Sequence, residues 1–121
     1  MFRIDKESKR IEITRGDRKG IRLKSKTLPF SVGDKIKFSI MEKKNYDNVL
    51  FQKVFEVTEE TNDFIITLTE EDTRIGPIIS KALICWYEIE YNGDATLIGY
   101  DGEGAKEMII YPEAPNKDKE V

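Results

Sequence analysis

Apolar and polar residues alternate with a period of two along most of this 121-residue chain. The clearest segment is KIKFSI at residues 35–40, in which Ile36, Phe38 and Ile40 would face a core while both lysines and Ser39 face solvent. Successive side chains of a β-strand point to opposite sides of a sheet, so this pattern predicts a strand with one buried face. The same alternation occurs at residues 10–14 and 20–24.

The segment NVLFQKVFEV, residues 48–57, is apolar on both faces, which predicts a central strand or a strand covered by a partner. Polar residues follow it at 58–63, and residues 64–68 then alternate again. A polar turn between two strand-like segments predicts a hairpin across residues 58–63.

Asn92-Gly93 is the strongest short-range hairpin signal in the chain, because both central positions of a type I′ turn need positive φ angles. We therefore expect residues 95–100 to pair with residues 86–91. A last strand is expected at residues 107–111, where Pro112 ends it.

Thr69 stands before three acids, which is typical of a helix N-terminus, and Gly76-Pro77 would stop such a helix within about a turn and a half. Short strands dominate and no βαβ unit is visible. We therefore expect an all-β fold, an antiparallel immunoglobulin-like β-sandwich with one short helical turn. Residues 1–112 are assigned to this domain and residues 113–121 to a flexible C-terminal tail.

The tripeptide Arg15-Gly16-Asp17 matches a cell-adhesion signal, but such a match indicates adhesion only on an exposed loop of a secreted protein. Both flanking segments alternate, so we interpret it as a turn between two strands, where Gly16 supplies backbone freedom and Asp17 can bond its own chain. The first residues, MFRID, are charged and lack a long apolar stretch. We expect no signal peptide and no membrane span.

The composition argues against catalysis, because the chain has no histidine and a single cysteine, Cys85. The usual proton carrier at neutral pH, the Ser-His and Cys-His nucleophiles and a His-based zinc site are therefore excluded. Glu88 and Glu90 share one strand face, which is expected to be the solvent face. We expect a protein that is not an enzyme and has no cofactor.

Three loop carboxylates, Asp94, Asp101 and Glu103, could approach one another and offer hard oxygen ligands to calcium. Their spacing does not match an EF-hand loop, so no metal site is assigned to them. The nearby glycines follow a strand without opening a helix, which excludes a phosphate-binding loop.

Charge is distributed unevenly along the chain. Residues 1–44 carry 14 Lys/Arg and 6 Asp/Glu, residues 45–121 carry 6 and 17, and the two halves are therefore +8 and −11. This asymmetry favours head-to-tail association or docking on a charged partner, unless the halves interleave in space and the charges average out. A basic strip could contact nucleic acid, but the chain is acidic overall, so a solvated face or a protein interface is favoured. The strip contains Arg15, Arg18, Lys19, Arg22, Lys24 and Lys26.

Aromatic residues gather near the expected Asn92-Gly93 hairpin, at Trp86, Tyr87, Tyr91 and Tyr100. Such rings can stack on sugars, so a carbohydrate-binding module is one alternative function. More often they fill a core or an interface, and alternation places Trp86 and Tyr87 on opposite faces.

Five segments in this order, IEITRGDRKGIRL, VGDKIKFSI, LTEEDTRI, CWYEIEYNGDATLI and MIIYPEA, resemble the N-terminal domain of phage baseplate upper proteins and related small phage proteins of low-GC Gram-positive bacteria. The resemblance spans residues 10–114, and Arg15, Gly16 and Asp17 match the family's opening turn. Members often continue into fibre segments with a receptor-binding module. This chain ends nine residues after Pro112, so direct host recognition is not expected.

The resemblance implies a phage or prophage structural protein of the baseplate or tail, located in the virion or in the host cytoplasm during assembly. Its expected partners are copies of itself or other tail and baseplate proteins; neither nucleic acid nor a membrane is expected. A third hypothesis is a small phage-encoded inhibitor that binds a host enzyme through its acidic half. The candidate interface residues are Arg15, Asp17, Arg18, Arg22, Lys24, Trp86, Tyr91 and Tyr100.

Overall fold

The computed structural model describes residues 2–4, 9–25, 29–75, 81–93, 95–99 and 104–113. Within these ranges the chain is all-β, with nine strands and no helix. The strands are β1 (Phe2–Ile4), β2 (Ile11–Thr14), β3 (Lys19–Lys24), β4 (Lys35–Glu42), β5 (Val49–Glu56), β6 (Asp63–Leu68), β7 (Leu83–Tyr91), β8 (Ala95–Ile98) and β9 (Lys106–Tyr111). None of the described segments is a helix long and apolar enough to cross a membrane.

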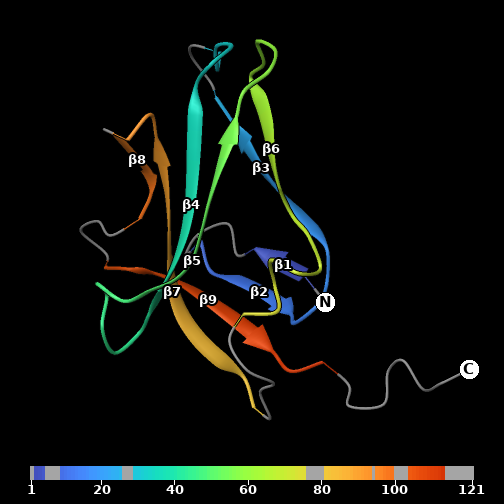
Figure 1. Ribbon diagram of the computed structural model, residues 1–121, viewed down its shortest axis with the longest axis vertical. Coiled ribbons are helices and arrows are strands. Elements are labelled where there is room, and N and C mark those ends of the chain that lie inside the picture. The colour runs from blue at the N-terminus through green and yellow to red at the C-terminus, as the bar shows by residue number, and fades with distance from the viewer. Residues whose placement is uncertain are drawn as a thin grey trace, which may run out of the picture.

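The strands form two sheets (Figure 1). Seven of them make one sheet in the order β1-β2-β9-β7-β4-β5, with β8 also paired to β7, and β3 and β6 make a two-stranded sheet. All pairs are antiparallel except β2 and β9, which run parallel. The expectation of a wholly antiparallel sandwich is therefore wrong at this pair. Alternation shows which side of a strand is buried and not which way its neighbour runs, and the long chain between β2 and β9 supplies the crossover that a parallel pair needs.

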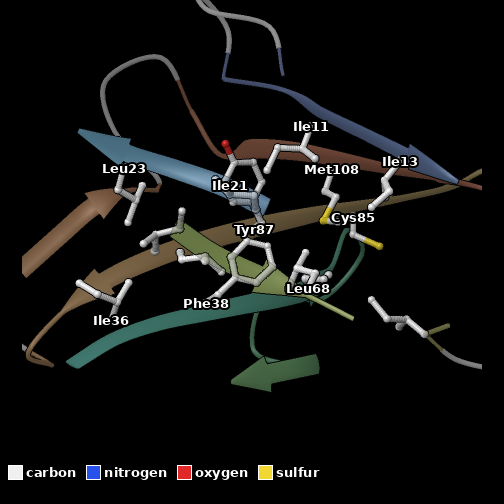
Figure 2. Close-up of a cluster of buried hydrophobic side chains, with 14 of the residues drawn as sticks. Ile11, Ile13, Ile21, Leu23, Ile36, Phe38, Leu68, Cys85, Tyr87 and Met108 are labelled. Carbon is white, nitrogen blue, oxygen red and sulfur yellow. The ribbon is translucent and has the colours of Figure 1, made fainter. Parts of the chain in front are cut away.

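One apolar core lies between the two sheets, consistent with a β-sandwich (Figure 2). The rings of Phe38 on β4 and Tyr87 on β7 stack with centroids 5.8 Å apart, and the two-stranded sheet contributes Ile21 and Leu68. The three core positions expected in KIKFSI are all buried, which confirms that strand and its inward face. Burial of each such side chain contributes about 1.5–3 kcal/mol, so this layer is the main source of stability.

Ser39 is an exception to the expected alternation, because it is only 3% exposed; on the same face of β4 it lies between Lys37 and Met41, and Met41 is also buried. β4 lies between β5 and β7, so both of its sides are covered by strands. The Gln52 amide of β5 donates a hydrogen bond of 3.1 Å to the Ser39 hydroxyl. A serine that was expected in solvent is therefore a satisfied polar group inside the sheet.

β5 is an edge strand and not a central one, and every one of its residues is at least partly exposed. The hairpin expected across residues 58–63 is also wrong, because β5 pairs with β4 while β6 pairs with β3 in the other sheet. The reason is a competing partner: the Val57 amide donates to the Asp34 carbonyl, and Thr61 exchanges backbone hydrogen bonds with Phe30. The segment after β5 is thereby held by residues 30–34.

A hairpin between β7 and β8 is confirmed, but it is shorter than expected: Ala95, Thr96 and Ile98 of β8 pair with residues 91, 90 and 89, and Tyr100 lies outside the described residues. Asn92 and Gly93 have φ angles of 52° and 75°, which confirms the positive values expected there, although Tyr91 pairs with Ala95 and not with the residue directly after the Asn92-Gly93 pair. The turn is also fastened to β4, because the Asn92 amide donates to the Lys35 carbonyl at 2.8 Å and the Asn92 side chain accepts the Lys35 amide at 2.7 Å.

Residues 69–74 form one hydrogen-bonded turn, in which the Thr73 amide donates to the Thr69 carbonyl at 3.3 Å, and it does not extend into a helix within the described residues. The capping contacts are present: the Asp72 amide donates to the Thr69 hydroxyl at 3.2 Å, and the Thr69 amide donates to the Asp72 carboxylate at 2.9 Å. Lys53 of β5 also binds that carboxylate, at 2.9 Å. These contacts close one turn. Thr73, at the end of this turn, forms hydrogen bonds with the Arg15-Gly16-Asp17 segment.

Candidate interaction surface

The Arg15-Gly16-Asp17 segment is a buried structural turn between β2 and β3, which belong to different sheets. Arg15 is only 7% exposed, and its guanidinium forms an ion pair with Glu113, which also pairs with Arg74. Gly16 has a φ of 85°, and a Cβ atom there would lie 2.9 Å from a Glu113 carboxylate oxygen. A side chain locked in this way cannot serve as an adhesion ligand.

Thr73 also holds this turn in place, and it is only 1% exposed. Its hydroxyl accepts the Gly16 amide at 2.9 Å and donates to the Asp17 carbonyl at 2.9 Å. Neither Thr73 nor Glu113 was identified from the sequence, since they lie 57 and 98 residues from their partners and no local pattern links them. Glu113, which was assigned to the tail, is therefore tied to the first turn of the domain.

The three arginines of the basic strip pair with acids of the other half of the chain, while Lys19 and Lys24 have no ion pair among described residues and Lys26 lies outside them. Arg22 and Lys24 share the outer face of β3, where Arg22 lies 3.3 Å from Asp63, and Arg18 lies 3.6 Å from Glu70. Among described residues, six ion pairs join residues 1–44 to residues 45–121. They are Arg15–Glu113, Arg18–Glu70, Arg22–Asp63, Lys35–Glu56, Lys37–Glu90 and Lys43–Glu107. The charges of the two halves thus interleave in space. This favours a surface on which the charges average out, and not a molecule with one positive and one negative side.

The candidate aromatic residues are engaged within the fold. The ammonium of Lys43 lies 5.3 Å from the centre of the Trp86 ring and also pairs with Glu107. The Tyr91 hydroxyl donates to Asp34, and its ring lies 6.0 Å from that of Phe30. A sugar would have to displace these contacts in order to stack, so the carbohydrate alternative gains no support. Tyr100 lies outside the described residues.

Asp34 connects the loop before β4 to the Asn92-Gly93 turn. The hydrogen bond from the Tyr91 hydroxyl, followed by one from the Ser31 amide, holds the pKa of the Asp34 carboxyl below its usual value. These hydrogen bonds, with one from the Asn92 side-chain amide at 3.2 Å, fasten the loop before β4 to the Asn92-Gly93 turn.

Cys85 is a buried thiol on the inner face of β7. Burial, with a smaller contribution from the nearby Glu42 charge, raises its pKa to about 11. A thiol with this pKa stays protonated at neutral pH, so Cys85 is a core side chain and not a nucleophile.

The described residues contain no group of three or more histidines, cysteines, aspartates or glutamates that could hold a metal ion. The three loop carboxylates weighed for calcium, Asp94, Asp101 and Glu103, lie outside the described residues. A shallow hollow of about 390 Å³ is open on the outer face of the large sheet. It is lined by Lys35, Lys37, Val54, Asn92 and Gly93.

β5 has more exposed large apolar side chains than any other described strand. Val54 is 53% exposed, and Val49 and Leu50 are exposed beside it. Val54 stands opposite Lys37 of β4, and a bulge in the pairing of these strands leaves Leu50 without a direct partner on β4. The large sheet ends at β5 in the described topology, where β5 pairs with β4 alone, so no described strand pairs with the other side of its backbone.

Comparison of the chain with protein-family models, curated proteins and solved structures finds no match. Among the described strands, β5 exposes three large apolar side chains, Val49, Leu50 and Val54, beside an open backbone edge, while β6 and β8, which also pair with one strand each, expose one apiece, Ile65 and Leu97.

Proposed function

We propose that this chain is a phage or prophage structural protein, an immunoglobulin-like β-sandwich that acts through protein–protein contacts and not as an enzyme. Its partners are copies of itself or neighbouring tail or baseplate proteins, in the virion or in the host cytoplasm during assembly. The phage assignment is supported by the five segments within residues 10–114 that resemble, in the same order, the N-terminal domain of phage baseplate upper proteins.

The observation that carries the interaction function is the exposed edge of β5. Soluble proteins normally protect edge strands with charges, prolines or a covering element, because an open edge recruits other strands. β5 instead exposes Val49, Leu50 and Val54. Exposed apolar groups beside an open backbone edge are typical of a surface that is covered in an assembly.

The ion pairs of the arginines near β3 and the burial of Arg15 also favour β5 over the basic residues as the interaction surface. Arg15 is buried, and Arg18 and Arg22 are matched by carboxylates of the same molecule, so they offer a partner little net charge. Exposed ion pairs of this kind contribute about 0–1 kcal/mol each, which makes them solubilising groups more than anchors.

The test is native mass spectrometry and light scattering of the purified chain, alone and mixed with the products of neighbouring tail genes. We expect self-association or a stoichiometric complex, and we expect Val54→Lys to weaken it. Ile65→Lys is the matched control, because Ile65 is 47% exposed on β6 in the other sheet. A strict monomer that binds none of these proteins would contradict the proposal.

A further inference from the structure

We propose that β5 forms the contact between two copies of this chain, paired antiparallel about a two-fold axis that passes beside Val54. The inference rests on the proposed assembly function and adds the occupant, the geometry and the register of the contact.

The backbone of β5 specifies what kind of partner fits. Its described pairing is with β4 alone, so the amide and carbonyl groups on its other side point away from the sheet. Another extended backbone satisfies such a row of groups, and a second β5 presents the same row after a two-fold rotation. The large sheet would then continue from one copy into the next.

Three residues on each face of β5 define the side-chain match. Gln52, Val54 and Glu56 lie on the outer face, opposite Ser39, Lys37 and Lys35 of β4. Phe51, Lys53 and Phe55 lie on the inner face, and both phenylalanines pack against the core. Two residues that stand opposite each other in an antiparallel pair share a face, so only registers that keep these two sets apart are allowed.

The register centred on Val54 matches every pair. Val54 stands beside Val54 of the second copy, Gln52 beside Glu56, and Lys53 beside Phe55. These are an apolar pair, an amide–carboxylate hydrogen bond and a cation–aromatic contact, all of which favour cross-strand association. Lys53 already makes the aromatic contact within its own chain, where its ammonium lies 5.4 Å from the centre of the Phe55 ring.

The neighbouring registers match less well. A register centred on Lys53 would place two lysines directly opposite each other, which is destabilising. A register centred on Gln52 would set Val54 against Leu50, at the point where the bulge interrupts the pairing with β4.

Lys53 points inward from the edge strand β5. A lysine in such a position is a common way to prevent edge pairing. Here its ammonium binds the Asp72 carboxylate at 2.9 Å, in the turn at residues 69–74. The charge is therefore paired within the molecule. On the outer face Lys37, beside Val54, is likewise paired with Glu90 at 3.3 Å.

The experiment is a charge swap at position 54. Val54→Lys and Val54→Asp are each expected to weaken dimerisation at least about tenfold, because each places like charges opposite each other across the two-fold axis. An equimolar mixture of the two variants should form a heterodimer, because lysine and aspartate then face each other. Native mass spectrometry separates the two variants by mass, and near-UV circular dichroism verifies that each is folded.

The controls are Ile65→Lys and Ile65→Asp, which leave dimerisation unchanged if β5 is the contact. Wild-type dimers that persist in both Val54 variants, or variants that stay monomeric when mixed, would overturn this pairing. A wild-type chain that is monomeric but binds a neighbouring tail protein would also overturn it while leaving the assembly function intact. A monomer that binds nothing would overturn both.

Discussion

Replacing Thr73 by valine tests how much its hydrogen bonds to the Arg15-Gly16-Asp17 turn contribute to stability. The substitution changes the shape of the side chain very little. The valine keeps the buried volume and removes one hydroxyl. That hydroxyl accepts the Gly16 amide and donates to the Asp17 carbonyl, each at 2.9 Å. Gly16 is buried, so water cannot readily take the place of the hydroxyl.

The cost follows from the two groups that lose a partner. A buried amide left without an acceptor costs about 1–3 kcal/mol, and the lost hydrogen bond to the half-buried Asp17 carbonyl adds about 0.5–1.5 kcal/mol. We therefore expect Thr73→Val to lower the free energy of unfolding by about 2–4 kcal/mol. For a protein with a total stability of about 5–15 kcal/mol this is a large fraction, yet the variant should still fold.

Urea unfolding followed by circular dichroism measures the change. With an m value of about 1.5 kcal/mol/M, the midpoint should fall by about 1.3–2.7 M while m stays the same. Thr73→Ser keeps the hydroxyl and should lose only about 1 kcal/mol, for the missing methyl group. Thr58→Val, at an exposed position, should change stability by less than about 0.5 kcal/mol. A Thr73→Val protein as stable as Thr58→Val would refute this account of the turn.

Three further predictions follow from individual residues. Gly16→Ala should lower the free energy of unfolding by about 1–3 kcal/mol in the same urea assay, because it places a side chain at a φ of 85° against Glu113. Unchanged stability would show that the Glu113 side chain can move to make room for the added methyl group. The folded-state pKa of Asp34 is lowered, so its contribution to stability is present above its unfolded pKa of about 3.9 and is lost as pH falls through the folded value. The melting temperature should therefore drop below about pH 4 and should do so less steeply in Asp34→Asn; parallel pH profiles would contradict this. Cys85, with a pKa raised to about 11 by burial, should react with a thiol reagent at pH 8 only after denaturation, and rapid labelling of the native protein would place it outside the core.

Local patterns predicted the features whose physical cause is local. The inward face of KIKFSI depends only on side-chain alternation, and the Asn92-Gly93 turn depends only on the φ angles of two residues, 52° and 75°. Both predictions are confirmed. The turn reading of Arg15-Gly16-Asp17 is confirmed for the same reason, since Gly16 adopts a φ of 85° there.

The features that the sequence did not reveal depend on distant partners. The chain after β5 leaves its sheet because residues 30–34 bind Val57 and Thr61, and a polar turn looks the same whether it closes a hairpin or crosses to another sheet. β5 was expected to be either a central strand or a strand covered by a partner because it is apolar on both faces; the structure excludes the central position, and composition alone does not separate the two. Arg15 was a candidate interface residue because nothing nearby identifies Glu113 as its partner.

Hydrogen exchange of the β5 amides, measured by mass spectrometry at increasing protein concentration and with the neighbouring tail proteins, tests most directly whether this edge is where the chain assembles. Assembly through β5 predicts fast exchange in the dilute chain at the alternate amides of residues 49–56 that do not bond to β4, and clear protection of these amides in the associated state, while β3 and β6 are unchanged. Association that protects other strands and leaves residues 49–56 exchanging at the dilute rate would contradict it.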